Sequence, residues 1–184
     1  MIVLPGGGGA GAHLRRPRQP RRRWFPVLLL LLVVGLSLLA LRGGSSPSVV
    51  LRDGATGQVL FERAVEPGER VELHHTHSVT RRPVVEIFGV DTTPTLTLEG
   101  MVFDHPGPNL PTGPERFGGR LTGFTTVDGV YRVDHHSYPI GSVTIGVGRP
   151  SVDHTLVFSD GTRVRFLDLT RAGAAIELEV LPAA

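Results

Sequence analysis

The sequence contains neither cysteine nor lysine. Without cysteine, the protein can form no disulfide, no thiolate metal site and no cysteine nucleophile. All 19 basic residues are arginines, and the first 42 residues hold seven of them and no acidic residue. Residues 43–184 hold the other 12 arginines and all 17 acidic residues, so their net charge is −5. An acidic domain repels phosphate groups, which excludes a simple basic nucleic-acid-binding protein and predicts no nucleic-acid partner.

The N-terminal segment predicts a membrane anchor. Residues 1–23 are rich in glycine, proline and arginine, which predicts a disordered tail. Residues 24–41 carry no charge and would form a helix about 27 Å long, enough to cross a bilayer core. We therefore expect an uncleaved anchor at residues 24–42, with the arginine-rich tail in the cytoplasm. A cleaved signal peptide is the alternative, and both interpretations place residues 43–184 outside the cytoplasm.

The rest of the chain predicts an all-β domain. A linker at residues 43–47 is followed by short β-rich runs, and three Asp-Gly pairs between runs suit tight turns. We expect an antiparallel β-sandwich or partly open barrel of about 10–11 short strands within residues 48–184. The longest irregular segment, residues 104–119, is a candidate functional loop. The expected strands are 48–53, 58–63, 70–79, 84–90, 95–103, 120–127, 130–136, 142–147, 152–159, 162–167 and 175–181.

A histidine cluster lies on the third expected strand, RVELHHTHSV. Alternation places His75 and His77 on its apolar face. If the turn to the next strand lies within residues 80–83, paired positions sum to 163, which sets His77 against Glu86. Glu86 is the one carboxylate among the inward positions of its strand, and a charge there needs a partner.

This cluster has three interpretations. His77 and Glu86 could form a structural pair that fixes the hairpin register. His75, His77 and Glu86 could instead bind zinc or another divalent metal, with His105 or His154 as a fourth ligand. The same polar groups could also line a ligand or partner pocket without a cofactor. A hydrolase is disfavoured because Ser78 faces away from His77 and the sequence has no G-x-S-x-G nucleophile elbow.

Several motifs carry a resemblance to a known family. They are the G-x-V-L-F run at residues 57–61, HSV at 77–79, P-V-x-E at 83–86, F-D at 103–104 with Gly107, Leu110 and Pro111 downstream, and H-T-L-x-F at 154–158. With these motifs the chain resembles the bacterial family called domain of unknown function 1850, over roughly residues 48–181. The sequence departs from the family at Pro108 and Asn109, where the family usually has a small residue or glycine.

The resemblance implies a role in solute uptake, since genes of the family are often found beside tripartite (TAXI-type TRAP) solute transporters. It therefore implies a non-enzymatic accessory or binding module at the bacterial cytoplasmic membrane. The partners implied are a transporter permease or a solute-binding protein. The candidate binding residues are His77, Ser78, Glu86, Asp104, His105 and His154. The alternative is a metal-binding protein or metal-dependent enzyme that uses His75, His77 and Glu86.

Overall fold

The computed structural model describes residues 46–183, which form twelve β-strands and one short helix. The strands are β1 (Ser48–Asp53), β2 (Val59–Ala64), β3 (Arg70–Thr76), β4 (Pro83–Val90), β5 (Leu96–Phe103), β6 (Arg116–Phe117), β7 (Arg120–Leu121), β8 (Gly123–Val127), β9 (Val130–Gly146), β10 (Thr155–Phe158), β11 (Arg163–Arg165) and β12 (Ala175–Leu181). The helix is α2 (Phe166–Leu169). The predicted all-β class is therefore confirmed.

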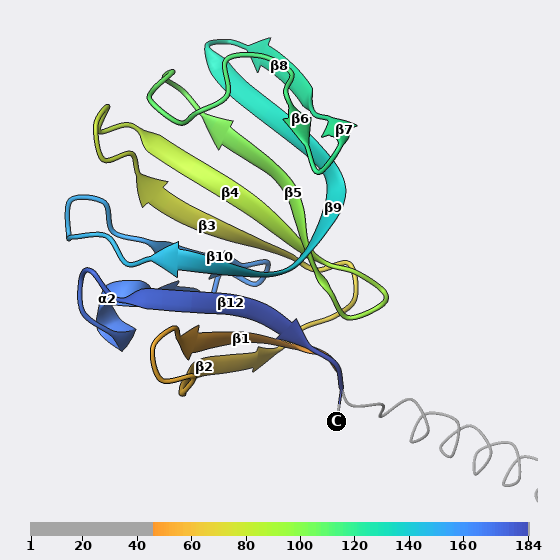
Figure 1. The fold of residues 1–184 in the computed structure, drawn as a ribbon, viewed down its shortest axis with the longest axis vertical. Coiled ribbons are helices and arrows are strands. Elements are labelled where there is room, and N and C mark those ends of the chain that lie inside the picture. The colour runs from red at the N-terminus through yellow and green to blue at the C-terminus, as the bar shows by residue number, and fades with distance from the viewer. Residues whose placement is uncertain (1–45, 184) are drawn as a thin grey trace, which may run out of the picture. The chain divides into compact units, whose positions relative to one another are not determined.

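Ten of these strands form one curled antiparallel sheet (Figure 1). Its order is β11-β10-β3-β4-β5-β9-β12-β1-β2, with β8 paired to β9, while β6 and β7 form a separate pair. The sheet curls into a half-barrel, which matches the partly open barrel among the predicted architectures. Its two edges meet through side chains, since Phe61 packs on Phe158 at 5.9 Å and Arg63 pairs with Asp160 at 3.1 Å.

The long strand β9 makes the corner of the half-barrel. Its first part pairs with β5 and β8, and its last part pairs with β12. The sequence predicted two strands here, but one strand of 17 residues runs through both. Its irregularities are absorbed at His136, Ser137 and Gly141, which have positive φ angles, and its register with β5 shifts nearby. Such bulges bend a strand without ending it.

Other predicted strands are interrupted or shortened, among them 152–159, which is observed only as β10 (Thr155–Phe158). The predicted strand 120–127 is interrupted at Thr122, whose backbone N–H donates to the Glu115 carbonyl instead of to a sheet neighbour. The predicted strand 162–167 gives way to helix α2 at Phe166. The predicted strand 70–79 ends at Thr76 as β3, because His77 begins a turn.

The main core fills the curl of the sheet. Alternation on β3 buries Val71 and Leu73, both 1% exposed, while Phe88 on β4 and Leu178 on β12 reach the same core. A smaller cluster of Val84, Phe103 and Val133 lies apart from it. The inner face of β4 therefore carries buried apolar residues on both sides of Glu86, and this position defines the candidate site.

The predicted N-terminal tail and anchor, residues 1–42, lie outside the described residues. No helix within residues 46–183 is long and apolar enough to cross a membrane.

Candidate functional site

A cleft of about 410 Å³ gathers most of the predicted site residues. It lies between the inner faces of β3 and β4, the loop that follows β5, and the segment between β9 and β10. Val84, Met101, Leu110 and Val152 form its apolar walls. The predicted site residues that line it are His75, His77, Ser78, Glu86 and His154.

The register of β3 and β4 differs from the predicted one. Paired positions sum to 159 instead of 163, so Leu73 lies opposite Glu86 and His75 lies opposite Val84. The predicted cross-strand pair of His77 and Glu86 is therefore wrong. The connection between the strands runs from residue 77 to residue 82 and is longer than predicted. Since the slip is an even number of residues, Glu86 still faces the same side of the sheet as His75.

His77 is a structural residue of this turn. Its ring is only 9% exposed, and its Nδ1 accepts hydrogen bonds from the backbone N–H groups of Val79 and Thr80, each at 3.2 Å. The Nε2–H donates to the Pro108 carbonyl at 2.9 Å. His77 thus ties the β3–β4 turn to the loop after β5, and both ring nitrogens are engaged.

The loop after β5 closes tightly on His77. A Cβ added at Gly107 would lie 3.2 Å from His77 Cε1 and 2.8 Å from Thr80 Cγ2. Asn109 has φ 65°, a left-handed conformation that asparagine tolerates better than most residues other than glycine.

His75, Glu86 and His154 form the polar centre of the cleft. His75 Nδ1 lies 4.0 Å from Glu86 Oε1, too far for a hydrogen bond, and the His75 and His154 ring centroids are 5.1 Å apart. His75 Nδ1 is buried and has no hydrogen-bond partner among the described residues. His154 Nδ1 accepts a hydrogen bond from the Gly148 N–H at 3.2 Å, which leaves its Nε2 to carry the proton of the neutral ring.

Burial keeps the two imidazoles of this centre neutral. Burial, with the nearby His154 and His77, lowers the pKa of His75 from 6.5 to about 4. Burial also lowers the pKa of His154 and raises the pKa of Glu86. Near pH 7 the cleft therefore presents uncharged imidazoles beside a carboxyl group whose charged form is disfavoured.

Two predicted residues lie elsewhere. Asp104 pairs with Arg82, whose Nε donates to Asp104 Oδ1 at 3.0 Å, and this hydrogen bond lowers the pKa of Asp104. The pair joins the β3–β4 turn to the end of β5, as His77 does for the next loop. His105 is exposed on that loop and does not line the cleft.

Sequence reasoning missed several residues of the cleft. Met101 and Leu110 are apolar residues with no distinctive pattern, and nothing in the sequence marked them. Gly148 was also missed, although a Cβ there would lie 2.7 Å from Val152 Cβ and 3.3 Å from His154 Cε1. A glycine in the short segment that carries His154 is the available signal for this close approach.

The predicted metal set is not assembled around a common point. No group of three or more histidine, aspartate or glutamate side chains in the described part of the chain is placed to hold a metal ion. His77 in particular uses both ring nitrogens for hydrogen bonds to the backbone. Zinc binding by His75, His77 and Glu86 stays a prediction.

Comparisons with known proteins give one family. The family model described as "Domain of unknown function (DUF1850)" matches residues 71–164, which include all but the first residue of β3, together with β4, the loop after β5 and β10. No curated protein matches the chain. No solved structure matches it either.

Proposed function

The chain belongs to the DUF1850 family, and we propose that it is a membrane-anchored extracytoplasmic binding module whose cleft holds a small organic molecule. The observation that carries this proposal is the polar centre of the cleft. His75 Nδ1 is buried without a hydrogen-bond partner, and the side-chain carboxyl group of Glu86 makes no hydrogen bond within residues 46–183. Buried polar groups are normally paired, because leaving one unpaired costs about 1–3 kcal/mol.

A ligand that donates hydrogen bonds would satisfy both groups. A hydroxyl or amine placed between His75 Nδ1 and Glu86 Oε1 could donate to either acceptor across their 4.0 Å separation. The apolar walls formed by Val84, Met101 and Leu110 suit the carbon skeleton of such a molecule. Small-molecule sites commonly combine an apolar lining with a few convergent polar groups.

The cleft favours binding over catalysis. Ser78 lies exposed on the β3–β4 turn, and no hydrogen bond joins it to a histidine in the described part of the chain. The Nδ1 atoms of His77 and His154 are engaged by backbone N–H groups. A nucleophile held by a base, the usual requirement of acyl transfer, is therefore missing from this group of residues.

We further propose that the module serves a TRAP-type solute transporter, as the family resemblance implies. In this proposal the N-terminal segment anchors the chain with its arginine-rich tail in the cytoplasm, so that the β domain meets solute outside. The partner would be the permease or its solute-binding protein.

The binding proposal is tested on the purified full-length protein. Small organic solutes that carry hydroxyl or amine groups are titrated into wild type and into His75→Ala, and affinity is measured by calorimetry. His74→Ala is the matched control, because His74 is on the same strand but pairs with Glu72 at 2.7 Å outside the cleft. We expect binding that His75→Ala weakens and His74→Ala leaves unchanged. Equal affinities in all three proteins would contradict the proposal.

The transporter link needs a separate experiment. Affinity capture from membranes should recover transporter subunits with the protein, and deletion of the gene should slow uptake by the neighbouring transporter. Unchanged uptake kinetics with transporter subunits at normal abundance would refute the accessory role while leaving the binding result untouched.

A further inference from the structure

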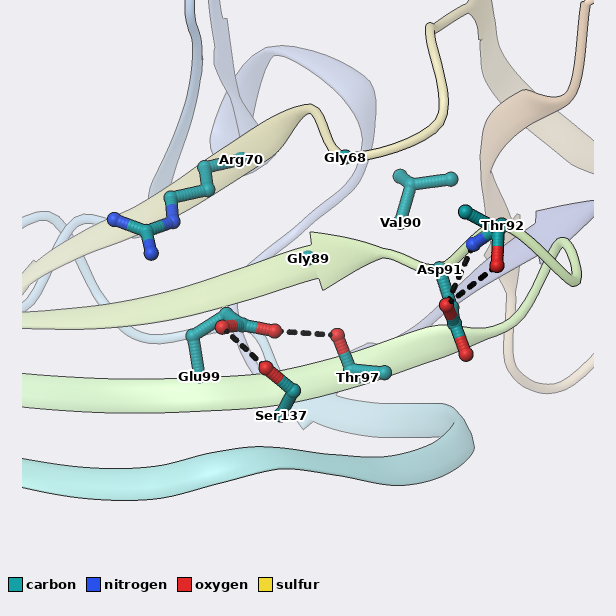
Figure 2. A pocket seen from close by; sticks show the side chains of 9 residues that line it. All are labelled: Gly68, Arg70, Gly89, Val90, Asp91, Thr92, Thr97, Glu99 and Ser137. Carbon is teal, nitrogen blue, oxygen red and sulfur yellow. Dashed lines mark hydrogen bonds between the residues drawn. The ribbon is translucent and has the colours of Figure 1, made fainter. Parts of the chain in front are cut away.

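A second hollow lies on the face of the sheet that points away from the cleft. It has a volume of about 220 Å³ and lies above Gly89 of β4 (Figure 2). Arg70 of β3 is the cross-strand neighbour of Gly89 on one side, and Thr97 of β5 is its neighbour on the other. β3 and β5 lie on either side of β4, and since adjacent strands are about 4.8 Å apart, their backbones are about 10 Å apart. Gly89 has no side chain, which leaves a gap between them.

Gly89 is needed for this arrangement. A Cβ at position 89 would lie 2.6 Å from Glu99 Oε1 and 2.7 Å from Thr97 Oγ1. The Glu99 side chain therefore extends over the backbone of β4, where a larger residue would displace it. Glu99 reaches this place because the register of β4 and β5 shifts beside it.

The Glu99 carboxylate is fixed by two hydroxyl groups. Thr97 Oγ1 donates to Glu99 Oε1 at 2.7 Å, and Ser137 Oγ donates to Oε2 at 2.9 Å (Figure 2). Ser137 and the preceding His136 have φ angles of 50° and 55°, a left-handed conformation that is unfavourable for residues with a side chain. Strain of this kind tends to persist at functional sites. Here it brings a hydroxyl to the carboxylate.

Neither Arg70 nor Glu99 has an oppositely charged partner at the hollow within the described residues. No cationic group in residues 46–183 lies within 4.0 Å of the Glu99 carboxylate, and Arg70 forms no ion pair or side-chain hydrogen bond there. Figure 2 shows Arg70 and Glu99 on opposite sides of Gly89. Asp91, at the other end of the hollow, is occupied by its own turn, since it accepts a hydrogen bond from the Thr92 N–H at 2.6 Å.

We propose that this hollow binds a small zwitterion, with its carboxylate on Arg70 and its ammonium group on Glu99. A guanidinium offers paired N–H donors that match a carboxylate. The Glu99 oxygens each accept one hydroxyl and retain a lone pair for an ammonium donor. The site is distinct from the His75 cleft, so the two can be tested independently.

The test uses the full chain in detergent micelles at pH 7, with three probes. L-Alanine carries both charges, methylamine carries the positive charge alone and propionate carries the negative charge alone. Affinities are measured by saturation-transfer NMR. We expect L-alanine to bind in the millimolar range or tighter and each single-charge probe to bind at least about tenfold more weakly.

Variants separate the site from its surroundings. Arg70→Gln and Glu99→Gln should each weaken L-alanine binding by at least about tenfold. Glu72→Gln, on the same face of β3, should leave it unchanged. Thermal unfolding checks that each variant is folded. Because Arg70 is exposed, Arg70→Gln should fold normally, and its effect on binding therefore tests the site. Methylamine binding as tight as that of L-alanine, L-alanine affinity unchanged in Arg70→Gln, or no L-alanine binding at about 10 mM would overturn the proposal.

Discussion

Lowering the pH from 7 to 5 should destabilise the β domain through His75. The pKa of this ring is about 4 in the folded protein and 6.5 when it is freely solvated. At pH 5 most unfolded molecules therefore carry a proton on His75 that the folded state excludes, so stability falls as the pH drops from about 6.5 towards 4. The corresponding loss between pH 7 and pH 5 is about 1–2 kcal/mol. The small exposure of the side chain, 15%, makes solvent screening minor.

Other groups in the cleft also contribute to the change in stability between pH 7 and pH 5. Their contribution cancels when wild type is compared with a His75 variant. Burial also lowers the pKa of His154, which adds to the loss at low pH. Burial raises the pKa of Glu86, and this acts in the opposite direction because the folded state takes up that proton first. The contribution of His75 is therefore measured as the difference between wild type and His75→Gln.

The assay is urea unfolding followed by circular dichroism at pH 7 and pH 5, on wild type, His75→Gln and the surface control His74→Gln. Wild type and His74→Gln should lose about 1–2 kcal/mol more stability over this interval than His75→Gln. The same loss in wild type and His75→Gln would show that His75 gains no proton on unfolding, and the assignment of a buried neutral imidazole would be abandoned.

Three further predictions concern His77, metal binding and topology. His77→Ala should lower the free energy of unfolding by about 1–3 kcal/mol, because the Pro108 carbonyl and two backbone N–H groups lose their partner, and His74→Ala should cost much less. Elemental analysis of the purified protein should find less than one zinc per chain, whereas stoichiometric zinc that disappears in His75→Ala would favour the metal alternative. An alkaline phosphatase fused after residue 184 should be active, and activity of a cytoplasmic reporter at the same point would reverse the predicted orientation.

The sequence was most informative where a local pattern alone determines structure. Apolar alternation was enough to predict β1 and β12 with their observed bounds, since both strands pack one face on the core. It was less informative in β9, where two strands, 130–136 and 142–147, were predicted, while one strand runs through both and absorbs its irregularities in bulges.

Five of the seven candidate site residues line one cleft, while the predicted pairing of His77 with Glu86 is wrong. The face shared by His75 and Glu86 follows from alternation, which a slip of four residues preserves. The length of the turn could not be predicted, because it depends on the His77 ring accepting two N–H groups and reaching Pro108 in a loop 31 residues away. The ion pair between Arg82 and Asp104 likewise could not be predicted, because it depends on contacts formed only after folding.

The place of β12 in the sheet sets the order in which the half-barrel can be completed. β12 is the last of the described strands in sequence, yet it lies between β9 and β1, and Ser48 pairs with Leu181. Within the described residues, the N-terminal hairpin of β1 and β2 joins the main-chain ladder only through β12. The main-chain pairing of this hairpin with the rest of the sheet must therefore wait for β12, and closing so long a loop is slow. During synthesis β1 is the first of the described strands to emerge and the last to pair with the rest of the sheet, and its edge stays open to other chains until then.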